Sequence, residues 1–280
     1  MLMVIDYTTE FDYSTPVWES QNVLRACPAD EPGQRRLWYQ LELDPSARVA
    51  SHVDVWGTRV DAFGVREPHT SLRVSARSSV ETTPRPRPLE VPMSHADDAY
   101  RTEHWAFLRP TSHTRWDDSL AAIAAESLRP GVVETVLAVE EAVRSRLVYT
   151  PGATHVGIDV NRVWEQAAGV CQDFAHLSIA MLRSVGLAAR YVSGYLYAAD
   201  PAHPDSVAGP VTTQTHAWLE VAVPGWGWWP IDPTNGVDVG ERHVVIGRGR
   251  DYDDVCPMRG VYYGESQHEL RAVVQISAEQ

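Results

Sequence analysis

The sequence predicts an α+β protein, with a β-sandwich-like N-terminal domain followed by a domain of helices and strands. Three observations predict this class. Residues 1–82 carry short alternating strand patterns, residues 83–94 are rich in proline, and residues 95–280 carry helical patterns followed by further strands. A chain of 280 residues is long enough for two such units, each with its own core.

The N-terminal strands are indicated by alternation and by the turn residues that separate them. In the first segment, Ile5 and Tyr7 alternate with Asp6 and Thr8, as in a strand with two different faces. Several short strands separated by proline, glycine and aspartate favour a β-sandwich. The predicted strand segments are VIDYTTEFDYSTPVW, RRLWYQLELDP, RVASHVDVWGTRVDAFGV and TSLRVSARSSVET.

A proline-rich segment, residues 83–94, separates the two units. Pro84, Pro86 and Pro88 fix their backbone dihedral and lack the N–H that a helix or a central strand needs. We therefore expect an extended linker here, with the second domain over residues 95–280.

The second domain begins with helical patterns and ends with strands. Helices are expected at residues 117–128, 131–147 and 171–185, with a short helix or turn at 163–169. Gly186 is placed to end the last of them, because glycine tolerates the left-handed conformation that often follows a helix. The strand patterns that follow are AARYVSGYLYA, THAWLEVAV and GWWPIDP, and the tail adds RHVVIGRGRDY and HELRAVVQIS.

The composition excludes several classes of function. The net charge of −13 repels phosphate backbones and anionic lipids, so we expect no nucleic-acid and no membrane partner. All 24 basic residues are arginine, which excludes chemistry that needs a lysine. No dinucleotide fingerprint and no metal-ligand spacing occur, so we expect no cofactor and no metal. The absence of a secretory or membrane-spanning apolar run predicts a cytoplasmic protein.

Cys171 has the position that a nucleophile would have. It follows a glycine-containing segment and begins the helical pattern CQDFAHLSIAMLRSVG. A helix start offers unpaired N–H groups and the positive end of the helix dipole, and both favour a thiolate. The alternative is a small core residue, the commoner role of a lone cysteine on an apolar helix. Cys27 and Cys256 are expected to be structural.

A nucleophilic thiol needs a base, and the base needs an orienting group. His176 lies roughly 140° around the helix from Cys171, so it cannot reach the sulfur. His216 begins a predicted hairpin, in which a turn at residues 224–227 brings Asp232 onto the neighbouring strand. We therefore expect Cys171, His216 and Asp232 to act together, although each of them taken alone more often has a structural role.

Further residues are assigned to the oxyanion site and to the substrate cleft. The oxyanion would lie at the start of the helix, with a second donor from Gln166 or Trp164, between which the sequence does not choose. Trp218 and Trp228 are candidates for an apolar cleft, although core packing is at least as common a role. Residues 198–214, rich in proline, aspartate and glycine, are expected to form a wall of this cleft.

Several segments resemble the bacterial transglutaminase-like superfamily, whose members are often described as cysteine proteases. They are GVCQDFAHLSIAMLRSVGLAARYVSGYL, THAWLEVAVPGWGWWPIDPTNG and GRGRDYDDVCPMRGVYYG, and the stretches YTTEFDYSTPV and DVWGTRVDAFGVREPHTSLRVSARSSVE resemble the N-terminal region of the group. The resemblance implies a papain-like, transglutaminase-like domain in which a helix bundle packs on an antiparallel sheet. It also implies a catalytic triad of Cys171, His216 and Asp232.

Together these features predict a cysteine-dependent enzyme of amide bonds, which would be a peptidase, an amidase or an acyl transferase with a thioester intermediate. The substrate would be a protein or peptide that offers a peptide bond or a glutamine side chain. Water or an amine can resolve the thioester, and the sequence does not decide between them. The alternative function is a non-catalytic scaffold of the same fold that binds a protein partner.

Overall fold

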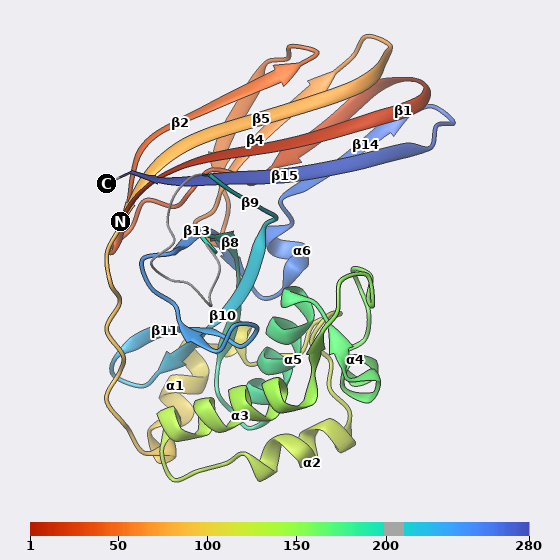
Figure 1. The fold of residues 1–280 in the computed structure, drawn as a ribbon. Coiled ribbons are helices and arrows are strands. Elements are labelled where there is room, and N and C mark those ends of the chain that lie inside the picture. The colour runs from red at the N-terminus through yellow and green to blue at the C-terminus, as the bar shows by residue number, and fades with distance from the viewer. Residues whose placement is uncertain (199–209, 280) are drawn as a thin grey trace.

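A long first strand organises the N-terminal sheet. The computed structural model describes residues 1–198 and 210–279 (Figure 1). β1 (Leu2–Leu24) pairs antiparallel with β5 (His69–Thr82) on one side and with β15 (His268–Glu279) on the other. The predicted N-terminal strands are therefore confirmed as a strand-rich region, with β1 at its centre.

The remaining strands of this region extend the sheet in two directions. β2 (Gln34–Asp44) and β9 (Val211–Thr213) complete the order β2-β5-β1-β15-β9. The second half of β1 pairs with β4 (Arg59–Val65) and β14 (Met258–Tyr263), and β3 (Val49–Val53) pairs with β4. All these strands form the upper part of the molecule in Figure 1.

The chain returns to the N-terminal sheet at its C-terminal end. The pattern HELRAVVQIS is a strand as expected, and its partner is β1. The division into residues 1–82, 83–94 and 95–280 stays a prediction, but the last of these ranges includes strands of the N-terminal sheet. Pairing between strands so far apart in the sequence leaves no local pattern from which it could be predicted.

The proline-rich segment contains neither helix nor strand over residues 83–91. It is attached to the rest of the protein by its arginines. Arg85 donates to Glu31 at 2.9 Å, and Arg87 forms an ion pair with Asp238.

Helices follow this segment. The helices predicted at residues 117–128, 131–147 and 171–185 are confirmed, and the short helix or turn predicted at 163–169 is a helix that begins and ends three residues earlier. These helices are α2 (Asp118–Glu126), α3 (Val132–Arg146), α4 (Val160–Gln166) and α5 (Cys171–Ser184). Short elements that the sequence did not predict are η1 (Met93–His95), α1 (Asp98–Glu103), η2 (Trp105–Phe107), β6 (Val148–Tyr149), β7 (Ala168–Gly169) and α6 (Tyr252–Val255). Among the residues that the structure describes, no helix is long and apolar enough to cross a membrane.

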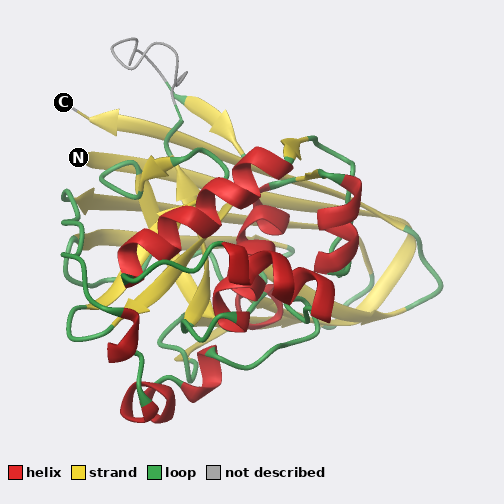
Figure 2. Ribbon diagram, turned by 90° about the horizontal axis from the view of Figure 1, so that it is seen from below, coloured by secondary structure: helices red, strands yellow, loops and turns green. Residues whose placement is uncertain are grey.

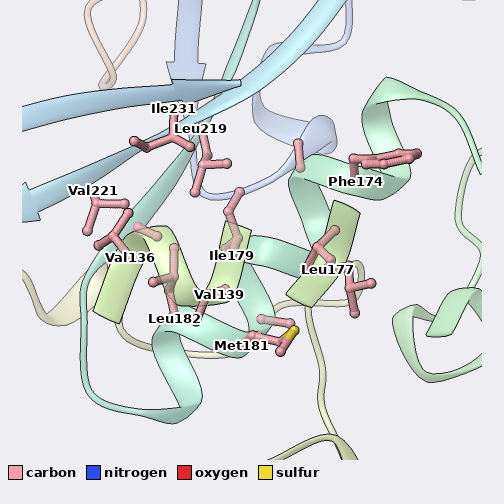
Figure 3. Packing of buried hydrophobic residues seen from close by; sticks show 14 of the residues in the cluster. Val136, Val139, Phe174, Leu177, Ile179, Met181, Leu182, Leu219, Val221 and Ile231 are labelled. Atoms are coloured by element: carbon pink, nitrogen blue, oxygen red, sulfur yellow. The ribbon is translucent and has the colours of Figure 1, made fainter. Parts of the chain in front are cut away.

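The central helix of this layer is α5, in which every residue from Asp173 to Arg183 is buried. Figure 3 shows its residues Leu177 and Ile179 among side chains of α3 and of the neighbouring sheet. Gly186 follows its last turn with φ of 88°, the left-handed conformation expected at that position.

The second sheet is antiparallel and has the order β12-β11-β10-β8-β13. Its strands are β8 (Ala189–Leu196), β10 (His216–Val223), β11 (Gly227–Asp232), β12 (Val237–Asp238) and β13 (His243–Gly249). Ala217, Leu219 and Val221 of β10 belong to the hydrophobic core that the helices share, whereas Trp218 and Glu220 lie on the opposite face.

The second sheet lies between the helices and the N-terminal sheet (Figures 1 and 2). Ile5 and Tyr7 of β1 share one buried cluster with Tyr195 of β8 and with Val244 and Ile246 of β13. Strands of the two sheets therefore have a common core, which fixes the N-terminal region against the second sheet.

A buried carboxylate also joins the two sheets. Glu220 is 1% exposed, and it accepts hydrogen bonds from Arg190 at 2.7 Å and from Arg248 at 2.8 Å. Arg248 in turn donates to Glu31 of the N-terminal region at 2.6 Å. Burial alone would raise the pKa of Glu220, but Arg248 and Arg190 outweigh it and lower the pKa to about 2.

The change Glu220→Gln tests this connection. It leaves Arg190 buried without a carboxylate, so we expect the free energy of unfolding to fall by roughly 3 to 5 kcal/mol. The contribution of Glu220 is present above its unfolded pKa of 4.5 and is lost as the pH falls through about 2. Urea unfolding at pH 7 measures the loss.

The matched control is Glu81→Gln, because Glu81 forms an exposed ion pair with Arg35. Its removal should cost less than about 1 kcal/mol. Equal losses for the two variants would show that the buried network does not stabilise the fold.

Candidate active site

The first turn of α5 is held so that Cys171 occupies its first position. Asp173 accepts the N–H of Val170 at 2.8 Å and the hydroxyl of Thr154 at 2.6 Å. A Cβ atom at Gly169 would lie 2.7 Å from the Cβ of Asp173, so glycine leaves the space that this carboxylate needs. The short segment before Cys171 therefore serves to build the helix start.

Cys171 differs from the other two cysteines in its exposure. It is partly exposed, whereas Cys27 and Cys256 are buried. Its backbone N–H, at the first helical position, has no acceptor within the helix. Cys27 accepts from the Arg36 guanidinium at 3.1 Å, and Cys256 lies 3.3 Å from the Tyr252 hydroxyl, as structural cysteines would.

His216 and Asp232 meet across the β10–β11 hairpin. His216 is the first residue of β10 and Asp232 the last of β11, and the pairing of Leu219 with Ile231 sets their register. The Nε2 atom of His216 donates to Oδ2 of Asp232 at 2.9 Å. The hairpin therefore brings these two side chains together as predicted.

Asp232 is fully buried and receives several hydrogen bonds. Its Oδ2 atom accepts from His216, from His243 at 3.1 Å and from Asn235 at 2.8 Å. Its Oδ1 atom accepts the N–H of Thr234 at 3.1 Å. Burial alone would raise the pKa of this carboxyl, but the hydrogen bonds from His216 and His243 hold it far below its ordinary value. Asp232 is therefore an anion at neutral pH.

His216 links this anion to the thiol. Burial alone would lower its pKa, but the hydrogen bond to Asp232 and the nearby Cys171 outweigh burial and raise the pKa to about 10. His216 is therefore protonated at neutral pH. Because its Nε2 atom is directed at Asp232, the other ring nitrogen is the one available to the sulfur.

His243 is a residue of this site that the sequence did not predict. Its Nδ1 atom accepts the N–H of Gly240 at 3.4 Å, so its proton is on Nε2, which faces Asp232. Burial lowers its pKa even though Asp232 opposes this effect, so the ring is neutral. β13 brings His243 to the site by pairing with β8, and no local sequence pattern indicates that pairing.

Within the part of the chain that the structure describes, two groups of side chains have the composition of metal ligands. His216, Asp232 and His243 present ligand atoms within 4.8 Å of one another, and so do His113, Asp251 and Asp253. In the first group both imidazole Nε2 atoms donate to the carboxylate, so a metal ion would have to displace those protons. The expectation of no metal stays a prediction.

Cys171 and His216 line one open cavity of about 710 Å³. Tyr149 of β6 and Pro151 of the turn that follows it line this cavity, and the C-terminal strand β15 also contributes to it. Among the described residues, none of those lining the cavity is an aspartate, a glutamate or an arginine. Its complete described lining is Tyr149, Pro151, Gly152, Val170, Cys171, Leu196, Thr212, Thr213, Gln214, Thr215, His216, Ala272 and Val273.

The loop before His216, residues 198–214, was expected to form a wall of the cleft. Thr212, Thr213 and Gln214 of this loop do line the cavity. Residues 199–209 lie outside the described part of the chain.

The two tryptophans assigned to the substrate cleft do not line this cavity. Trp218 is fully buried and its ring packs edge-on against His243, with 5.3 Å between the ring centroids. Trp228 lies farther along the hairpin, where Arg190 stacks over its ring at 4.0 Å and Phe107 packs against it. Trp228 belongs to the same hairpin as His216 and Asp232, but its ring lies away from the cavity that contains the thiol.

The two candidates for the second oxyanion donor also lie outside the lining. The Gln166 side chain donates to the carbonyl of Ala168 at 2.9 Å. The ring of Trp164 lies under the Arg146 guanidinium, which is 5.4 Å from the ring centroid. Neither side chain is directed into the cavity that contains Cys171.

His176 was excluded as the base on geometry, and it has another partner. It is buried, and its Nε2 atom accepts the N–H of Tyr252 at 3.2 Å. Burial lowers its pKa well below the ordinary value, and the nearby His113 and Arg183 add to this effect.

Two family descriptions match separate parts of the chain. "Transglutaminase-like superfamily" matches residues 120–233, which include the cysteine, the histidine and the aspartate of the site. "Bacterial transglutaminase-like N-terminal region" matches residues 3–81.

Relatives of similar length and a solved structure of the same fold are known. An uncharacterized protein of Mycobacterium leprae is 36% identical, over 98% of each chain. An uncharacterized protein of Mycobacterium tuberculosis is 35% identical, over 95% of this chain and 89% of its own. A structure from Cytophaga hutchinsonii, described as a "Putative Cysteine Protease", is 22% identical, covers all of this chain and 92% of its own, and shares the fold with a TM-score of 0.78.

The change Asp232→Asn tests the electrostatics of the site. Removing the anion should lower the pKa of His216 from about 10 toward its ordinary value of 6.5. In the unchanged protein, the protonation of His216 stabilises the fold fully below pH 6.5, and this stabilisation is lost as the pH rises through about 10. We expect this pH dependence of the free energy of unfolding to be weaker in the variant. Titration of the imidazole C–H signals by NMR measures the shift.

The control for this titration is Asp238→Asn, because Asp238 is exposed in its ion pair with Arg87. This change should leave the His216 signal in place. A His216 that still titrates near 10 without Asp232 would contradict the assigned cause of its high pKa.

Proposed function

Because the chain belongs to the transglutaminase-like superfamily, we propose that it is a cysteine-dependent enzyme that acts on amide bonds of proteins or peptides. Cys171 is the nucleophile, His216 exchanges protons with it and with the leaving group, and Asp232 orients the histidine. The observation that carries the proposal is the hydrogen bond from the His216 imidazole to the buried carboxylate of Asp232, on a histidine that lines the same open cavity as the thiol of Cys171.

The first half of the reaction forms a thioester. The sulfur of Cys171 attacks the carbonyl carbon of the amide, and the carbonyl π electrons move onto oxygen. The N–H of Cys171 donates to this oxyanion at the start of α5. When the intermediate collapses, the C–N bond breaks and His216 gives its proton to the leaving nitrogen.

The second half of the reaction returns the enzyme to its first state. Neutral His216 takes a proton from a water molecule or an amine, whose oxygen or nitrogen attacks the thioester carbonyl. The C–S bond breaks, and the sulfur leaves as the thiolate next to the newly protonated imidazole. Asp232 stays an anion throughout and stabilises the imidazolium.

We propose hydrolysis as the main outcome, because water is abundant and the cavity is open. The proposed compartment is the cytoplasm, on the composition of the sequence.

The reactivity of the thiols tests the nucleophile. Cys171 is partly exposed and faces an imidazolium, so iodoacetamide should modify it at least about ten times faster than Cys27 or Cys256. Peptide mapping by mass spectrometry after short exposure measures the three rates in the same sample. Three slow and similar rates would favour the non-catalytic scaffold, because such a scaffold needs no activated thiol.

A trapped intermediate tests the reaction. We expect a peptide library that contains glutamine to leave an acyl group on Cys171 after an acid quench. His216→Gln should slow acylation by roughly 10² to 10⁴, the usual contribution of an acid–base group. When an amine is added, the ratio of carboxylic acid to substituted amide among the products measures how much hydrolysis occurs relative to acyl transfer.

The variants Cys171→Ala and Cys256→Ala form a matched pair for this experiment. Cys171→Ala should fold with a stability within about 1 kcal/mol of the unchanged protein and form no adduct. Cys256→Ala should still form it. If Cys171→Ala unfolds instead, the thiol has a packing role.

A further inference from the structure

The C-terminal strand β15 has an unpaired edge beside the cavity. On one side, β15 pairs with β1 from His268 to Glu279. On the other side, β9 pairs only with Val274–Ile276. Among the described residues, the segment His268–Val273 therefore has no strand on this edge, and all six of its residues are exposed.

The unpaired edge continues into the cavity that contains the thiol. Ala272 and Val273, the last residues of this segment, line the same cavity as Cys171 and His216. β9 occupies the edge just beyond them and ends at Thr213, three residues before His216. One row of main-chain hydrogen-bonding groups thus leads from the surface to the reacting atoms.

We propose that the substrate is an extended polypeptide segment that adds as a strand to the edge of β15 at His268–Val273. This inference rests on the proposed function and names the substrate class of that site. An unpaired edge offers N–H and C=O groups at strand spacing, and an extended chain satisfies them by β-strand addition. Six residues span about 20 Å, so a bound segment has one end in the cavity.

The side chains from Leu270 to Val273, at the cavity end of the edge, favour an uncharged segment. Leu270 is 53% exposed and Val273 is 40% exposed, so both offer apolar surface. Arg271 is already paired with Asp12 on β1 and is not free to select an acidic partner. The described lining of the cavity carries no carboxylate and no arginine. The residues nearest the reacting amide are therefore expected to be neutral.

This mode of binding requires a flexible substrate. A segment that pairs with β15 must expose its own main-chain groups, and a strand inside a folded sheet has none to offer. An unfolded protein or a loop can supply such a segment. A second copy of this chain could also pair at the edge, and the experiment below separates that case.

Hydrogen exchange on the inactive variant Cys171→Ala tests binding without turnover. The probe is dephosphorylated β-casein, an unfolded polypeptide. We expect amides within His268–Val273 to exchange at least about ten times more slowly when the probe is present in excess. The outer edge of β2 (Gln34–Asp44) belongs to the same sheet and serves as the internal control, with unchanged exchange.

Three results would overturn the proposal. They are no protection of the segment at a saturating probe concentration, equal protection of β2, and protection that appears without the probe and increases with protein concentration. The last of these would show that a second copy occupies the edge.

The change Leu270→Glu tests the edge during turnover. We expect the charge at position 270 to lower kcat/KM for β-casein about ten-fold by raising KM. The reason is that the bound substrate loses an apolar contact of about one buried side chain. Leu37→Glu on β2 is the control, since Leu37 is 45% exposed on the far edge of the sheet. Equal kcat/KM values for the two variants would contradict the proposal.

The rate of Cys171 alkylation distinguishes this proposal from the proposed function. It should be unchanged in Leu270→Glu, because the edge does not activate the thiol. Slow alkylation in the unchanged protein would refute the proposed enzyme, whereas exchange on Cys171→Ala would still report on the edge.

Discussion

The position of β10 in the middle of the second sheet is the constraint on which the site depends. β8 and β11 pair with it on either side, and its two faces bury different chemistry. Leu219 and Val221 pack into the helical core, while Glu220 meets two arginines on the other face. A shift of one residue would bury Glu220 among the helices, at a cost of several kcal/mol. The packing that selects this register also determines where His216 lies.

The charges of the site follow from the same register. Because β11 pairs in register with β10, Asp232 is buried beside His216, and β13 adds His243 on the same carboxylate oxygen. A buried carboxylate without donors would take up a proton, whereas these donors keep Asp232 ionised. The anion in turn keeps His216 protonated. The charge of Asp232 therefore acts on the thiol through the His216 imidazole. The strand pairing of the second sheet therefore determines both the buried packing around β10 and the charges of Asp232 and His216.

The sequence predicted those parts of the site that depend on local patterns. Helical periodicity located Cys171 at the start of α5, and a short hairpin was enough to join His216 with Asp232. It did not predict His243 or the part of the cavity wall that β15 supplies, because both depend on strands that pair across long distances in the sequence. The role assigned to Trp228 shows a related limit. Alternation predicts the face of a side chain, but only the folded hairpin shows how far it is from the reacting group.

The cavity also relates the N-terminal region to the residues that we propose for catalysis. The thiol and the imidazole come from α5 and β10, but Ala272 and Val273, which line the same cavity, belong to β15. β15 is held along its whole length by β1, whose own position depends on the core shared with Tyr195 and Val244 of the second sheet. Without β1, β15 would lose its continuous strand partner and the cavity would lose a wall. The N-terminal region therefore contributes to the site through strand pairing, although none of its own side chains is among the described residues that line the cavity.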